Sequence, residues 1–249
     1  TSLLQIENEF YGTIRPKRVI RPGERPLHAL RERGVEYVEV RLMDLDPFEP
    51  IGLNADTARF LDLFLLHCLL EDSPPDSPDE IAAVKNNQHL TAARGREPGL
   101  LLQRLGQPVT LADWAADIVG QLEPMAAAMD AQDGGRAYAD ALAAARAALA
   151  APHTLPSARV LSAMRAEHAD SFSAFVSARS LDTRARLLAL PYSADLKARF
   201  DQLAAASVAE QKRIEASDQV PFEDYRREYT SPERLGTGAR AVLAGAESV

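Results

Sequence analysis

The residue types best suited to chemistry lie near the start of the chain, in the segment Gly34–Arg41. Residues i and i+2 of a β-strand point to the same side, so a strand here places Glu39 and Arg41 on one face. A carboxylate is a hard oxygen ligand suited to Mg²⁺, and a guanidinium can bind phosphate oxygens through paired hydrogen bonds. The pattern therefore fits a site for a metal ion and a phosphate. It fits equally a cross-strand ion pair on a solvated sheet face.

A second expected strand covers residues 4–11 and also carries carboxylates. Glu7, Glu9 and Tyr11 share one of its faces, opposite a mainly apolar face. The sequence opens inside this strand and has no initiator methionine. We therefore expect the chain to be a piece of a larger protein.

The connection from Gly12 to Arg33 is strongly basic within an acidic chain of net charge −8. It has two acidic residues and these seven basic ones: Arg15, Lys17, Arg18, Arg21, Arg25, Arg31 and Arg33. Its prolines and Gly23 argue against regular structure and predict a loop. Such a local positive charge favours an anionic partner, although a merely solvated loop fits too. No aromatic residues interleave with the charges and the sequence pI is about 5.2, so nucleotide phosphates fit better than nucleic acid.

These residues, together with several later segments, resemble the bacterial glutamate–cysteine ligases of the proteobacterial type. The resemblance includes the uncommon run Ile14-Arg-Pro-Lys-Arg18. It is strong over about the first 110 residues and weaker to about residue 222. The matching segments are residues 4–18, 34–41, 44–52, 59–64, 95–99 and 155–161.

The resemblance implies a glutamine-synthetase-like catalytic fold, with an antiparallel sheet around a metal–ATP–glutamate site. It also implies the first reaction of glutathione synthesis, and the composition separately fits a cytoplasmic protein. ATP phosphorylates the γ-carboxylate of L-glutamate, and the amino group of L-cysteine then attacks the acyl phosphate. The family pattern makes Glu39 a Mg²⁺ ligand, sets Arg41 against the transferred phosphoryl group and places Tyr11 in the cysteine pocket. Arg15, Lys17 and Arg18 match a basic segment near the nucleotide phosphates.

The N-terminal half of such an enzyme supplies the remaining metal ligands and the glutamate-binding arginine, and these are not in this sequence. The resemblance therefore implies the C-terminal half of a ligase, inactive when isolated. Two alternatives stay open. The chain could be a non-catalytic remnant that binds nucleotide or a partner chain. It could also belong to a related γ-glutamyl amide ligase with a different amine acceptor.

The composition fits a soluble protein with an α+β fold. Cys68 is the sole cysteine, so an intrachain disulfide is excluded, and its apolar neighbours predict a buried structural thiol. The longest apolar run, residues 60–70, is too short to span a membrane. We expect catalytic-sheet strands in residues 1–53, a helical region in 54–229 and a loose tail in 230–249. The expected helices are 54–71, 79–93, 110–131 with a possible kink at Pro124, 136–151, 157–179 and 194–217.

Overall fold

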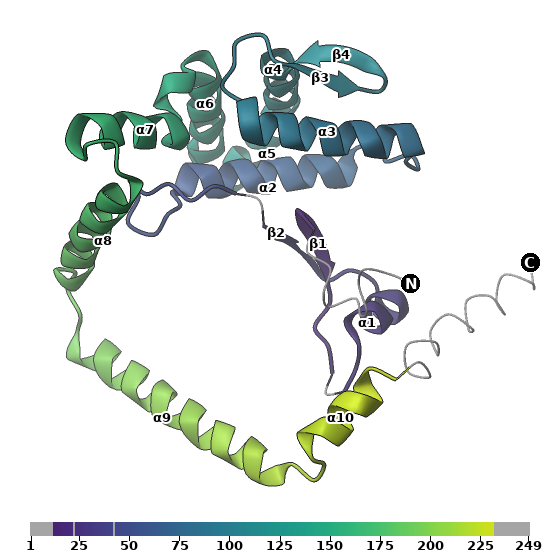
Figure 1. The fold of residues 1–249 in the computed structure, drawn as a ribbon, viewed down its shortest axis with the longest axis vertical. Helices are drawn as coiled ribbons and strands as arrows, with labels where there is room; N and C mark the ends of the chain where they lie inside the picture. The colour runs from purple at the N-terminus through teal and green to yellow at the C-terminus, as the bar shows by residue number, and fades with distance from the viewer. Residues whose placement is uncertain (1–11, 22, 42, 232–249) are drawn as a thin grey trace, which may run out of the picture. The chain divides into compact units, whose positions relative to one another are not determined.

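The computed structural model describes residues 12–21, 23–41 and 43–231. The chain has an α+β fold of two small antiparallel sheets and many helices (Figure 1). It divides into two compact units, one made of residues 1–44 and 191–249 and the other of residues 45–190. In the described residues, no helix is long and apolar enough to cross a membrane.

The first unit contains a two-stranded antiparallel sheet of β1 (Ile14–Lys17) and β2 (Tyr37–Val40). Helix α1 (Pro26–Arg33) lies between the strands in sequence. The prediction of an irregular loop over 12–33 is therefore wrong, because Pro16 and Pro26 occupy positions that tolerate proline. Pro26 stands in the first turn of α1, where a helix needs no N–H. Pro16 lies opposite Val38, between hydrogen-bonded pairs of the ladder, so the missing N–H faces away from β2.

Two C-terminal helices complete this unit, α9 (Ala194–Ser217) and α10 (Phe222–Tyr229). The expected helix 194–217 is confirmed, and the hydroxyl of Ser193 caps it by accepting a hydrogen bond from the backbone N–H of Leu196. Arg25, only 2% exposed, donates from Nη1 to the carbonyl oxygen of Tyr229 at 2.8 Å. Its guanidinium also stacks over the Tyr229 ring. Arg25 is thus a structural link between the start of α1 and the end of α10.

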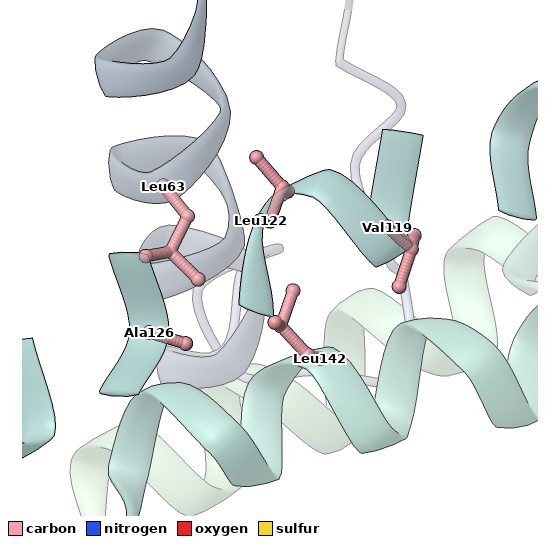
Figure 2. Close-up of a cluster of buried hydrophobic side chains, with 5 residues drawn as sticks. All are labelled: Leu63, Val119, Leu122, Ala126 and Leu142. Carbon is pink, nitrogen blue, oxygen red and sulfur yellow. The ribbon is translucent and has the colours of Figure 1, made fainter. Parts of the chain in front are cut away.

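The second unit is mainly helical. It contains α2 (Ala55–Leu70), α3 (Pro78–Arg94), α4 (Leu111–Gln121), α5 (Glu123–Asp133), α6 (Ala137–Ala150), the short 3-10 helix η2 (Pro152–Thr154), α7 (Pro156–Glu167) and α8 (Phe172–Leu188). A hairpin of β3 (Leu101–Arg104) and β4 (Gln107–Thr110) joins α3 to α4. The core cluster comes from four helices and consists of Leu63, Val119, Leu122, Ala126 and Leu142 (Figure 2).

Several expected boundaries in this unit are confirmed. Asn54 caps α2 and Thr110 caps α4, each by accepting a hydrogen bond from a backbone N–H three residues later. Two predictions are wrong in detail. The expected helix 110–131 ends at Gln121, and α5 starts anew with its proline in the first turn. The expected helix 157–179 is two helices, because Ala169 and Asp170 adopt left-handed backbone conformations between α7 and α8.

The β3–β4 hairpin was not predicted. Its two-residue turn consists of Leu105 and Gly106, both with positive φ, which is the geometry that matches the twist of paired strands. The prediction of a buried Cys68 is also wrong, because Cys68 is exposed near the end of α2. Partial desolvation raises the pKa of its thiol, which disfavours the thiolate and a nucleophilic role.

Candidate functional site

The candidate site is one face of the β1–β2 sheet. The register places Arg15 directly opposite Glu39 and Lys17 opposite Tyr37. Alternate residues of a strand share a face, so Arg41 extends the same row just beyond β2. We call Arg15, Lys17, Glu39 and Arg41 the charged ladder. The charged ladder arises because side chains alternate between the two faces of each strand, and the antiparallel pairing places three basic side chains and one carboxylate on the same face.

Glu39 forms two ion pairs in this ladder. Its Oε1 lies 2.6 Å from Nε of Arg41, and its Oε2 lies 3.1 Å from Nζ of Lys17. The three side chains are each about one-third exposed. Hydrogen bonds from Arg41 and then from Lys17 lower the pKa of Glu39, so its carboxylate is ionised at neutral pH. The geometry contains the cross-strand ion pair that the sequence pattern allowed.

Arg18 does not join the charged ladder. Its Nε lies 3.7 Å from Oε2 of Glu36, and the same carboxylate oxygen accepts a hydrogen bond from the backbone N–H of Val19 at 3.1 Å. Glu36 directly precedes β2, and no ion pair joins it to the charged ladder. The structure therefore separates Arg18 from Lys17, although they are neighbours in sequence.

A second ion pair stabilises the connection between β1 and β2, and sequence reasoning missed it. Arg33 donates to both carboxylate oxygens of Glu24, at 2.5 Å and 2.8 Å, and also to the carbonyl oxygen of Val19. The backbone N–H of Arg21 donates to the same carboxylate. The Arg33 hydrogen bonds, followed by that from Arg21, lower the pKa of Glu24 to about 2. The sequence feature that could have indicated this ion pair is Glu24 itself, because it is one of only two acidic residues in this basic connection.

The donor set of the charged ladder fits an anion well and a metal ion only in part. The guanidinium of Arg41 has the planar fork that binds phosphate, and Lys17 adds a point charge. Glu39 is a suitable hard ligand, yet Mg²⁺ requires near-octahedral oxygen coordination. Across the described residues, no group of three or more His, Cys, Asp or Glu side chains is arranged to hold a metal ion. Tyr11 and the expected strand 4–11 lie outside the described residues.

Comparison with known proteins relates this chain to one family. Residues 1–91 match the family model for glutamate–cysteine ligase. The glutamate–cysteine ligase of Azotobacter vinelandii is 48% identical over 229 residues, which are 92% of this chain and 43% of that protein. That of Bordetella bronchiseptica is 46% identical over 233 residues, or 92% of this chain and 44% of that protein. The chain thus spans less than half the length of the curated relatives it matches.

A solved structure is similar over nearly the same extent. The crystal structure of the Francisella tularensis glutamate–cysteine ligase in complex with AMP has a TM-score of 0.81 and 33% sequence identity to this chain. The match covers 91% of this chain and 44% of that chain. Fold and sequence therefore agree on the same relationship.

Proposed function

Because this chain is related over about nine-tenths of its length to part of the bacterial glutamate–cysteine ligases, we propose that it forms part of such a ligase. The complete enzyme would use ATP and Mg²⁺ to join L-glutamate to L-cysteine through a γ-glutamyl phosphate. The observation that carries the proposal is the charged ladder, in which a carboxylate and two cations lie in contact on one face of the β1–β2 sheet. The solved relative in complex with AMP supports nucleotide binding.

Each residue of the charged ladder has a chemical role in this proposal. Arg41 binds the transferred phosphoryl group through its planar fork, and preorganised donors of this kind stabilise charge that develops in a transition state. Lys17 and Arg15 attract the nucleotide phosphates. Glu39 supplies one oxygen ligand, and Mg²⁺ would neutralise phosphate charge there. Tyr11 contacts the cysteine substrate. Arg18 lies in the vicinity of the phosphates without contacting them, because it pairs with Glu36 outside the charged ladder.

The chain alone supplies only some of the charged groups that such a catalytic site needs. Phosphoryl transfer requires several fixed charges together with glutamate held in line with the γ-phosphate. Glu39 is one ligand, and two cations already contact it. We therefore propose that further ligands and the glutamate-binding groups come from the part of the ligase that this chain does not span.

The direct test compares Glu39→Gln with Glu36→Gln in a complete ligase. The complete enzyme joins this chain to the part of the Azotobacter vinelandii ligase that it does not span. Glu36 is the matched control, because it directly precedes β2 and pairs with Arg18, outside the charged ladder. We expect Glu39→Gln to lower turnover by about 10²–10³-fold and to weaken the response to Mg²⁺, while Glu36→Gln stays within a few-fold of wild type. Near-wild-type turnover of Glu39→Gln at limiting Mg²⁺ would contradict the assignment.

A second experiment measures γ-glutamylcysteine formation by the 249-residue chain alone and after addition of that complementary part. We expect no dipeptide from the isolated chain and restored formation by the pair. ATP-dependent dipeptide formation by the isolated chain would mean that its site is complete. Nucleotide binding without dipeptide formation by the pair would favour a non-catalytic binding role. Formation of a different γ-glutamyl amide would mean that the amine acceptor is not L-cysteine.

A further inference from the structure

A cavity of about 820 Å³ lies within the second unit, away in sequence from the charged ladder. Its walls come from the end of α2, the start of α3, the turn of the β3–β4 hairpin and one face of α4. Figure 1 shows these four elements together in residues 45–190. A concave site of this size, formed by several elements of one compact unit, is large enough for a small organic ligand.

The interior of the cavity is mainly apolar and includes two aromatic side chains. Phe64 and Trp114 lie in its walls, with Val84, Leu105 and Ile118 beside them. Such a lining favours a ligand with an apolar or aromatic body, because burial of its surface in this cavity is favourable.

His67 is a weakly paired polar side chain in the wall. His67 is only 8% exposed and lines the cavity. Its nearest charged neighbour is Glu71, with Nδ1 and Oε1 separated by 3.7 Å, which is too long for a hydrogen bond. Among the described residues, no side-chain polar atom is both buried and without a partner, so the ring nitrogens of His67 that make no hydrogen bond reach the solvent and are accessible to a polar group that enters the cavity.

The rim of the cavity is acidic. Glu71, Asp79 and Glu80 line it, and no side chain of the described residues forms an ion pair with Asp79 or Glu80. Residues 71–80 carry five acidic side chains and no basic one. Arg104, the cation in the wall, is already paired with Asp117 at 2.6 Å and lies over the Trp114 ring. The field at the opening therefore favours a positively charged ligand.

We propose that this cavity binds a small organic cation with an aromatic or apolar body. The body packs against Phe64 and Trp114, and the ammonium group binds Glu80 and Glu71 at the rim. His67 accepts a hydrogen bond from the same ammonium group. The site is independent of the proposed ligase function, since none of its residues belongs to the charged ladder.

The test uses phenethylamine as the probe and the full 249-residue chain. Trp114 is the only tryptophan, so its fluorescence reports on this cavity alone. We expect a saturable change with phenethylamine. We expect binding at least about tenfold weaker with 3-phenylpropionate, which has the same ring and the opposite charge, because the acidic rim attracts an ammonium group and repels a carboxylate. Equal binding of the two compounds, or no saturable change, would overturn the proposal.

Three variants locate the binding. The double variant Glu80→Gln, Glu71→Gln removes charge from the rim and should weaken phenethylamine binding about tenfold or more. Ala83→Leu adds bulk to the cavity wall without changing the charge, and it should also weaken binding. Glu167→Gln, at an exposed carboxylate on α7 outside the cavity, is the matched control and should bind as the wild type does. Each variant is first checked for the wild-type helical circular dichroism. Unchanged binding in the folded double variant or in folded Ala83→Leu would refute the assigned site.

Discussion

Asn87 joins α3 to the hairpin through a pair of hydrogen bonds that resembles the pairing of two strands. Its Nδ2 donates to the carbonyl oxygen of Gln103 at 2.7 Å, and the backbone N–H of Gln103 donates to Oδ1 of Asn87 at 2.9 Å. The Asn87 residue is 7% exposed. The carboxamide therefore satisfies both backbone groups of Gln103 in β3, and this pair of hydrogen bonds is partly buried.

Replacing Asn87 with alanine leaves two backbone groups of Gln103 without partners. Each unsatisfied buried group costs about 1–3 kcal/mol, so we expect the unit to lose about 3 kcal/mol of stability. For a unit of this size, such a loss lowers Tm by about 6–12 °C. Thermal unfolding followed by circular dichroism gives the global effect. Amide exchange measured by NMR gives the local one, because the Gln103 N–H should lose its protection.

The neighbouring Asn86 provides the matched control. It is exposed on the same helix, so Asn86→Ala brings the same gain in helix propensity without breaking the link to Gln103. We expect its Tm to equal or slightly exceed that of the wild type. If Asn87→Ala melts within about 2 °C of Asn86→Ala and the Gln103 amide stays protected, the hydrogen-bond argument is wrong.

Two further predictions concern the first unit. The pKa of Glu24 falls from 4.5 to about 2 in the folded chain, so its contribution to stability is present above about pH 4.5 and is lost as the pH falls towards 2. Glu24→Gln should therefore flatten the pH dependence of urea unfolding in that interval, and an unchanged acid profile would refute the role of the Arg33 pair. Arg41→Lys keeps the charge but loses the planar fork, so in a complete ligase it should lower kcat far more than it raises KM for glutamate. A change confined to the glutamate KM would instead make Arg41 a carboxylate anchor.

The helices that sequence reasoning placed correctly carry their own start signals. Asn54 and Thr110 each have a side chain that caps a helix, and such signals depend only on residues a few positions away. The hairpin turn at Leu105 was missed because leucine rarely adopts a positive φ, and only Gly106 suggested a turn. The break within 157–179 was missed because the stretch keeps helical composition across it. Within 110–131, Pro124 indicated a kink, but not that one helix ends and another begins there.

The sequence predicted the contact between site residues of the same strand, but not which residue of the neighbouring strand would join them. The two-residue spacing alone placed Glu39 beside Arg41, and the structure has the two side chains in contact. The contact of Glu39 with Lys17 depends on the pairing of β1 with β2. The expected loop concealed that pairing, because Pro16 was read as a break rather than as a residue at a position without ladder hydrogen bonds. Register is a long-range property that local patterns do not determine.

The charges of the ladder lead to a last prediction, on the order in which ligands bind in the complete ligase. Glu39 is the only carboxylate among three cations, and two of them already contact it. A lone divalent cation is therefore repelled by its surroundings and must displace Lys17 or Arg41 from Glu39, whereas phosphate oxygens attract both cations away from the carboxylate. Binding of a metal ion at Glu39 should consequently require nucleotide.

Mn²⁺ can replace Mg²⁺ as a spectroscopic probe for this test. We expect electron paramagnetic resonance to show an Mn²⁺ site that depends on Glu39 only when ATP is present. Glu39→Gln should weaken that site, while Glu36→Gln, outside the charged ladder, should leave it unchanged. Mn²⁺ binding that depends on Glu39 with equal affinity in the absence of nucleotide would show that Lys17 and Arg41 do not oppose the metal ion, and the argument from the ladder's charge would then fail.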